Sequence, residues 1–368
     1  MIEMLRNRIP RDPRSLGAIT LLLLLGILIA CLWPFRAPKN TVSWVTGGRG
    51  IAFGRYGDIL GSTPLVLPGD REAASASIEI WLQPDPIRDM GSILAVYSSE
   101  NPRQFAINQW HTGLAIRSAA VGDPIHTGGA PCFTPDVFTP GKSVFVTITS
   151  SERGTEVYLN GSLSKITSTF RITNRMLSGK LVAGTAATMD DDWRGQLRGL
   201  AIYKRALDPE QVRNHYSSWT GIGRPDIRDS DGLLALYLFG ERTGRSLHNE
   251  VTGGGDLYVP ERYFIPVKDV LSPPSLDDWP DIISNIVGFL PLGFVLCGYL
   301  ISSRRTRLAV VVTTVMCGVF SLALESLQTF LPTRDSSMTD VITNLLGGAI
   351  GALLYRWATQ DRASAPRL

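Results

Sequence analysis

The stretch ALESLQTFLPTRDSSMTDVITN, residues 323–344, joins two apolar segments of membrane length and decides how the C-terminal part of the chain folds. Its polar side chains at the segment edges are those of Glu325, Gln328, Arg334, Asp335, Asp340 and Asn344. The first two are three residues apart and the last two are four apart, so each pair shares one face of a helix. Charge at a membrane boundary is costly to bury and usually faces a bundle interior or a wet cavity. Together with Asn285, about one turn inside the preceding segment, these residues predict a polar site near one membrane surface.

Apolar residues in this chain of 368 residues are concentrated rather than spread evenly. The four apolar segments are Leu16–Trp33, Ile282–Ile301, Leu308–Leu331 and Val341–Trp357. Each is about long enough to cross a hydrocarbon core of ~30 Å as a helix. The long polar region between the first and second segments contains no comparable run. The sequence therefore predicts an integral membrane protein with four spans and one large soluble insert.

The first apolar segment has a basic start, which a secretory signal peptide also has. Arg6, Arg8, Arg11 and Arg14 precede it, but it ends in CLWPF (31–35) without a small-residue cleavage pattern. A tryptophan at this end suits an interfacial anchor. We expect an uncleaved signal anchor, with a cleaved signal as the alternative.

Basic residues flank the spans on one side: before the first span, in the SSRRTR loop (302–307) and in the C-terminal tail. The positive-inside rule assigns that side to the cytoplasm. Both termini are then cytoplasmic, and the insert lies outside a bacterial inner (cytoplasmic) membrane. Removing the flanking arginines leaves a slightly acidic outer part, which argues against nucleic acid as a partner.

Cysteine usage gives little scope for disulfides or metal sites. Cys31, Cys297 and Cys317 fall within the apolar segments, which leaves Cys132 alone in the insert. A single thiol cannot form an internal disulfide, and no metal-ligand spacing is present. We expect Cys132 to be a buried small apolar residue.

The insert, from about residue 42 to 264, consists of short alternating runs separated by Gly, Pro, Asn and Asp. SIEIWL (77–82), SILAVY (92–97) and VFVTIT (144–149) are typical of strands. The Asn160-Gly161 pair after a strand-like run is a strong hairpin signal. Asp208 followed by Pro209 predicts a short helix over 208–216. The pattern predicts an all-β jelly-roll sandwich of two sheets.

Three segments of the insert resemble the laminin-G or concanavalin A-like lectin fold. They are SIEIWL (77–82), EVYLNG (156–161) and WRGQLRGLAIY (193–203) followed by RALD (205–208). The resemblance covers most of residues 42–240. It implies a jelly-roll sandwich that binds envelope glycans, although a fold does not by itself define a function.

The ligand chemistry of the insert is left open by its residues. Asp190, Asp191 and Asp192 could supply oxygen ligands to Ca²⁺, or they could form a solvated turn. Glu79 alternates with Ile78 and Ile80 and is expected to face solvent. The histidines His111, His126 and His215 are scattered, and Trp81 and Trp193 could be core residues. The insert is therefore expected to be a binding domain or spacer rather than an enzyme.

The C-terminal segments resemble the VanZ-like family. The pattern is Asn285-x3-Phe289-x-Pro291-Leu-Gly293, then Glu325-x2-Gln328-x5-Arg334-Asp335-x4-Asp340-x3-Asn344-x2-Gly347. The resemblance implies a cell-envelope protein of a family linked to low-level resistance to the glycopeptide antibiotic teicoplanin, and it implies no particular reaction.

The predicted domains follow from these boundaries. They are a cytoplasmic N-terminus (1–15), a transmembrane anchor (16–35), an extracytoplasmic lectin-like domain (40–264), a linker (265–281), a VanZ-like three-helix domain (282–357) and a cytoplasmic tail (358–368).

Three functions are compatible with the sequence. The first is binding: the sandwich holds an envelope glycan and the polar cluster engages a lipid headgroup, with Arg334 on a phosphate. The second is an enzyme for lipid-linked envelope precursors, with Glu325 or Asp340 as general base and Arg334 as charge stabiliser. No His, Ser or Cys nucleophile accompanies that cluster. The third is a structural role, in which the polar residues fasten the helices to one another.

Overall fold

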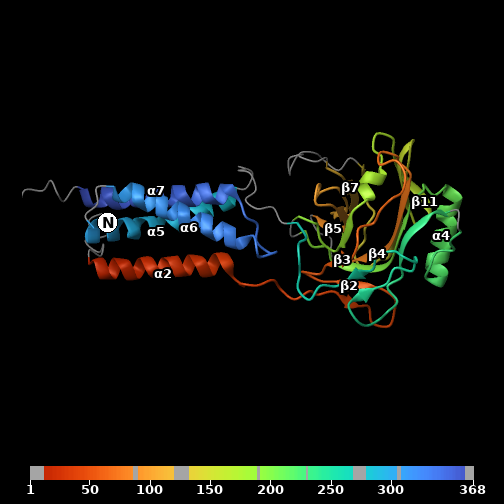
Figure 1. Ribbon diagram of the computed structural model, residues 1–368, viewed down its shortest axis with the longest axis horizontal. Helices are drawn as coiled ribbons and strands as arrows, with labels where there is room; N and C mark the ends of the chain where they lie inside the picture. The colour runs from red at the N-terminus through yellow and green to blue at the C-terminus, as the bar shows by residue number, and fades with distance from the viewer. Residues whose placement is uncertain are drawn as a thin grey trace, which may run out of the picture. The chain divides into compact units, whose positions relative to one another are not determined.

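The computed structural model describes residues 12–85, 90–119, 132–188, 191–228, 231–267, 279–304 and 308–360. The chain divides into two compact units. One contains Ala37–Lys268, and the other combines Met1–Arg36 with Asp269–Leu368. The first unit is a β-sandwich and the second a bundle of helices (Figure 1).

The sandwich consists of two antiparallel sheets. In the first sheet the strand order is β1 (Ser43–Trp44), β2 (Ile51–Phe53), β13 (Gly195–Tyr203), β4 (Ala76–Pro84), β9 (Val144–Ser151), β10 (Gly154–Leu159) and β11 (Ser162–Thr167), with β14 (Leu233–Tyr237) also paired to β13. In the second sheet it is β15 (Ser246–Leu247), β16 (Leu257–Tyr258), β3 (Ile59–Gly61), β12 (Lys180–Ala183), β5 (Gly91–Tyr97), β6 (Phe105–Trp110), β7 (Gly113–Arg117) and β8 (Cys132–Thr134). The predicted two-sheet sandwich is confirmed.

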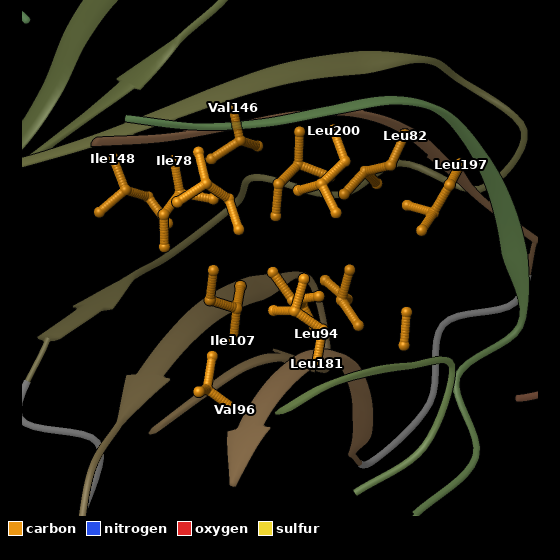
Figure 2. Packing of buried hydrophobic residues seen from close by; sticks show 14 of the residues in the cluster. Ile78, Leu82, Leu94, Val96, Ile107, Val146, Ile148, Leu181, Leu197 and Leu200 are labelled. Atoms are coloured by element: carbon orange, nitrogen blue, oxygen red, sulfur yellow. The ribbon is translucent and has the colours of Figure 1, made fainter. Parts of the chain in front are cut away.

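The core lies between the inner faces of the two sheets (Figure 2). The first sheet contributes Ile78, Leu82, Val146, Ile148, Leu197 and Leu200, and the second contributes Leu94, Val96, Ile107 and Leu181. All of these side chains are buried. Alternate residues of a strand point to opposite faces, so this apolar set fixes the register of both sheets. Cys132 is also buried in this core, as expected.

Local signals in the sequence specify the predicted turn and helix. Asn160 and Gly161 have positive φ angles of 50° and 77° and connect β10 to β11, which is the conformation that a tight hairpin requires. Helix α4 (Pro209–Ile222) begins after Asp208, whose side chain accepts hydrogen bonds from the backbone N–H groups of Glu210 and Gln211. The helix begins where the sequence predicts and extends beyond residue 216.

Helix α4 covers the outer face of the first sheet and buries Glu79 completely. The Glu79 carboxylate accepts hydrogen bonds from the Tyr203 hydroxyl at 2.7 Å, Trp219 Nε1 at 3.1 Å and His215 Nδ1 at 3.0 Å. The expectation that Glu79 faces solvent is wrong. The alternation in β4 correctly separates it from the core between the sheets, but α4 closes the other side.

His215 bridges two buried carboxylates. Its Nδ1 lies 3.0 Å from Glu79, and its Nε2 lies 3.4 Å from Oδ2 of Asp231. Burial lowers the pKa of His215, but the hydrogen bonds and negative charges of Glu79 and Asp231 outweigh it and raise the pKa above 6.5. Asp231 is buried too, which raises its pKa, yet donors from Arg228, Gln211 and His215 lower that pKa overall. The imidazolium form is therefore stabilised relative to that of a free histidine. We call Glu79, His215 and Asp231 the polar staple of α4.

The second unit contains helices α2 (Pro13–Leu32), α5 (Trp279–Arg304), α6 (Ala309–Gln328) and α7 (Met338–Gln360). Among the described residues, these four helices are long and apolar enough to cross a membrane. Helix α5 continues through Pro291. A Cβ on Gly347 or Gly351 of α7 would lie 2.4 Å or 2.1 Å from a backbone carbonyl oxygen of α5. Glycine is therefore required for the close approach of these two helices.

We expect the polar staple to make the stability of the sandwich depend on pH. Because the folded-state pKa of His215 is raised above 6.5, its contribution is complete below about pH 6.5 and is lost as the pH rises through the folded-state pKa. Thermal unfolding followed from pH 5 to 9 should show a declining midpoint, and His215→Gln should flatten that decline. The matched control is His248→Gln at an exposed histidine, which should keep the wild-type slope. Equal slopes in all three proteins would contradict the assignment.

Glu79→Gln should destabilise the sandwich by about 3–5 kcal/mol, because one partner of a buried ion pair is removed and buried donors lose their acceptor. Chemical denaturation followed by tryptophan fluorescence measures this. The control is Glu152→Gln in the turn after β9, where a side chain that is 73% exposed pairs with Arg171. Such a surface pair contributes about 0–1 kcal/mol. A loss no larger than that of the control would show that the staple does not hold α4.

Candidate functional site

The predicted polar residues of the bundle form hydrogen bonds between helices. Asn285 on α5 donates through Nδ2 to Oδ1 of Asp340 on α7 at 2.8 Å. Asn344, one turn further along α7, donates through Nδ2 to the Ser321 hydroxyl on α6 at 2.9 Å. Helix α7 is thus joined on one side to α5 and on another to α6 through polar side chains.

Two other predicted residues bind the C-terminal end of α2. Gln328 donates through Nε2 to the Cys31 carbonyl oxygen at 3.1 Å. Arg334 donates through Nη2 to the carbonyl oxygens of Trp33 at 3.1 Å and Ala30 at 3.3 Å. The last carbonyls of a helix have no partner within the helix, and Pro34, which follows, has no N–H group to offer them. The positive charge of a guanidinium at this position also interacts favourably with the negative end of the helix dipole.

Glu325 has the opposite role at the start of α7. Its side chain is buried, and its Oε2 accepts the backbone N–H of Ser337 at 3.0 Å, just before the helix begins at Met338. The carbonyl oxygen of Glu325 accepts the Ser336 hydroxyl at 3.0 Å. A carboxylate at a helix N-terminus is stabilised by the unpaired N–H groups and by the dipole. Glu325 therefore fixes the loop between α6 and α7 to the start of α7.

Gln328 and Arg334 therefore bring the end of α2 into the cluster. Asp335, the remaining predicted residue, is exposed in the loop. The participation of α2 was not predicted, because its contacts are made through backbone carbonyls, which no side-chain pattern reveals.

The aspartates suggested as calcium ligands lie in the loop before β13. Asp190 lies outside the described residues. Asp191 accepts Asn108 Nδ2 at 3.4 Å, and the Asp192 carboxylate accepts Arg194 Nε at 3.0 Å. Within the described parts of the chain, no group of three or more His, Cys, Asp or Glu side chains could hold a metal ion.

A second polar and aromatic patch lies on the outer face of the second sheet and was not predicted. Trp110 at the end of β6 and Phe133 on β8 are each 38% exposed, and their ring centroids lie 5.7 Å apart in an edge-to-face arrangement. The Arg117 guanidinium of β7 lies 5.6 Å from the centroid of the Trp110 ring. We call Trp110, Phe133 and Arg117 the aromatic patch.

Buried polar groups accompany the aromatic patch. Asn108 shares the outward face of β6 with Trp110 because the two are separated by one residue, and Ser92 of β5 pairs directly with Asn108. Oδ1 of Asn108 and Oγ of Ser92 are buried without a hydrogen-bond partner among the described residues. The alternation of Phe105 and Ile107 with Asn108 and Trp110 is the sequence signal that could have identified this face. Trp193, by contrast, is in the core and donates to Gln109 Oε1 at 2.8 Å.

The histidines do not form a catalytic group in the described structure. His215 belongs to the polar staple beneath α4, and His111 lies in the turn after β6 with a positive φ of 50°. His126 lies outside the described residues. The pairing of His215 with two carboxylates was missed, because they come from distant parts of the sequence.

Two family models match parts of the chain. The VanZ/LLP1 family model matches residues 234–359, a range that includes β14, β15 and β16 as well as α5, α6 and α7. The model of the concanavalin A-like lectin/glucanases superfamily matches residues 61–213. No curated protein sequence matches the chain.

Solved structures that are similar to the sandwich have low identity to it. A putative carbohydrate binding protein from Bacteroides ovatus is 10% identical, with a TM-score of 0.40, over 61% of this chain and 58% of that protein. A SAP-like pentraxin from Limulus polyphemus is 14% identical, with a TM-score of 0.36, over 63% and 96%. For the sialidase of Trypanosoma rangeli the identity is 15% and the TM-score 0.36, over 47% of this chain, which spans only 28% of the sialidase.

The two family matches agree with the architecture described above. The sandwich contains the lectin-like match, and the four membrane-length helices accompany the VanZ/LLP1 match. The C-terminal region of the chain is thus similar to the VanZ/LLP1 family, and a concanavalin A-like, laminin-G-like domain lies between the first and second membrane-length helices.

Proposed function

We propose that the sandwich binds a glycan of the bacterial cell envelope through the aromatic patch, while the helices hold the protein in the cytoplasmic membrane. The observation that carries this proposal is the exposed Trp110–Phe133 pair with Arg117 beside it. Aromatic faces provide large contact areas at low conformational cost, and a guanidinium supplies several hydrogen-bond donors in a fixed geometry. This combination suits a ligand with both C–H faces and hydroxyl or acidic groups, as sugars have.

The two sheets differ in the surface that they offer to a ligand. On the first sheet, α4 packs against the outer face, and residues such as Phe145 and Trp219 are buried there. On the second sheet, a small apolar cluster that includes Leu60 and Val182 occupies the strands β3 and β12. The β6–β8 end of the second sheet carries the aromatic patch, in which exposed aromatic rings adjoin a cation.

Unsatisfied polar atoms support the same location. A buried acceptor without a donor costs about 1–3 kcal/mol. Asn108 Oδ1 and Ser92 Oγ are in that situation on the strands next to Trp110. A sugar hydroxyl or an ordered water that reaches them removes this cost, so ligand binding and satisfaction of these groups are coupled in the proposal.

We propose a structural role for the polar cluster of the bundle. An enzyme acting on lipid-linked precursors, the alternative function, needs a base and a charge stabiliser that are available to substrate. The Glu325 carboxylate instead accepts a hydrogen bond from the backbone N–H of Ser337, and the Arg334 guanidinium donates to backbone carbonyls at the end of α2. A lipid-linked glycan still fits the proposal as ligand, because its polymer would meet the sandwich while its lipid remains in the bilayer.

Trp110→Ala should weaken glycan binding by about tenfold or more, as expected when an aromatic anchor is truncated. The full chain in detergent is applied to an array of envelope polysaccharides, and the affinity for the best ligand is then measured by calorimetry. The matched control is Tyr258→Ala, an exposed aromatic on β16 of the same sheet, four strands from β6. At about 4.8 Å per strand that separation is about 19 Å, so the control should bind as the wild type does. No glycan bound by the wild type, or equal losses in both variants, would refute the proposal.

Arg334→Gln should loosen the C-terminal turn of α2. Hydrogen bonds to charged groups contribute about 1.5–3 kcal/mol each, so we expect the reactivity of Cys31 toward a membrane-permeant maleimide to rise about tenfold or more. Cys297 and Cys317 are buried and serve as internal references. Asp335→Asn at the exposed neighbouring position is the control and should leave the rate unchanged. Unchanged Cys31 reactivity in Arg334→Gln would contradict the structural role.

A further inference from the structure

A cluster of basic side chains lies on the sandwich where the chain enters and leaves it. Lys39 and Arg262 are paired across an antiparallel bridge, and both are exposed. Residues directly opposite each other in an antiparallel pair place their side chains on the same face. Like charges in that position repel each other, so an anion between them would be stabilising.

The backbone at Arg55 adjoins this pair. The backbone N–H of Thr41 donates to the Tyr56 carbonyl at 3.2 Å, and the Thr41 hydroxyl donates to the Arg55 carbonyl at 2.7 Å. The segment containing Arg55 is therefore hydrogen-bonded to the segment that follows Lys39. Arg55 is exposed as well. We call Lys39, Arg55 and Arg262 the basic surface.

The charges of the basic surface are not neutralised within the described structure. None of its three side chains forms an ion pair with a described residue. Arg262 uses Nη1 to donate to the Ala37 carbonyl at 2.8 Å, which holds the two chain segments together and keeps the guanidinium in place. Phe264, two residues after Arg262, is 51% exposed and adds an apolar side chain next to the cations. The acidic residue Glu261, which immediately precedes Arg262, is also exposed.

The covalent connection limits how far the basic surface can lie from the membrane. Leu32 is the last residue of the membrane-length helix α2, and Lys39 follows it by seven residues. At about 3.5 Å per residue, a fully extended chain of that length spans about 25 Å. This tether keeps the basic surface at high effective concentration near the lipid headgroups.

We propose that the basic surface binds the anionic headgroups of the membrane in which the helices lie. Exposed cations and an exposed phenylalanine are the chemistry that recognises a negatively charged lipid surface. Each basic residue near such a surface shifts the equilibrium toward the bound form by roughly fivefold, hence by about a hundredfold for three. The sandwich is then held against the bilayer, and glycan binding by the aromatic patch is a separate property.

The test uses the full chain in lipid nanodiscs made of phosphatidylcholine alone or with about one third phosphatidylglycerol. A donor dye is attached to a cysteine introduced at the exposed Thr243, in a Cys31→Ala background, and acceptor dyes are attached to the lipid headgroups. Energy transfer should increase when phosphatidylglycerol is present. Raising the salt from about 0.1 M to about 1 M, which shortens the Debye length from about 10 Å to about 3 Å, should reverse the increase.

The decisive comparison is between two triple variants of equal charge change. Lys39→Glu/Arg55→Glu/Arg262→Glu should lose the response to phosphatidylglycerol. Lys142→Glu/Arg153→Glu/Lys165→Glu replaces exposed basic residues elsewhere on the sandwich and should keep it. Tryptophan fluorescence of each variant confirms that the sandwich remains folded. Energy transfer that is independent of phosphatidylglycerol in the wild type, or lost equally in both triple variants, overturns the proposal.

Discussion

The constraint on which the bundle depends is that helix ends among apolar neighbours must find partners for their backbone groups. The last carbonyls of α2 are bound by Gln328 and Arg334, and the start of α7 is bound by Glu325. These three side chains come from the end of α6 and the loop that follows it. One short stretch of sequence thus supplies donors to one helix end and an acceptor to another, each with the charge that the helix dipole favours.

In the sandwich, the polar staple provides partners for a buried charged side chain. Glu79 is buried on the outer face of its sheet, where an unpaired carboxylate would be strongly unfavourable. Tyr203, Trp219 and His215 all donate to it, and Asp231 holds the other side of His215. Because the members of this network come from the sheet, from α4 and from the loop beyond it, the network specifies where α4 lies.

Much of the fold could be predicted because its signals are local. The Asn160-Gly161 turn, the Asp208 cap and the four apolar segments each depend on a few neighbouring residues. The site was predicted only in part. Spacing indicates that Asp340 and Asn344 share a helix face, but it cannot reveal that their partners are Asn285 and Ser321. The misplacement of Glu79 has the same origin, since strand alternation distinguishes two faces and carries no information about a helix that arrives 130 residues later to cover one of them.

The insertion of the sandwich between α2 and α5 depends on how close the two ends of the sandwich lie to each other. A domain can be inserted between two helices with little disturbance when its ends lie close together. The bridge between Lys39 and Arg262, supported by the hydrogen bond from Arg262 to Ala37, brings the two ends of the sandwich side by side. Helix α2 can therefore remain part of the bundle, with its last carbonyls bound by Gln328 and Arg334, although the next helix of the bundle, α5, begins almost 250 residues later. Gln328 and Arg334 thus find their hydrogen-bond acceptors on α2. Because the two ends of the sandwich are paired, α2 can supply these acceptors despite the large insert that follows it.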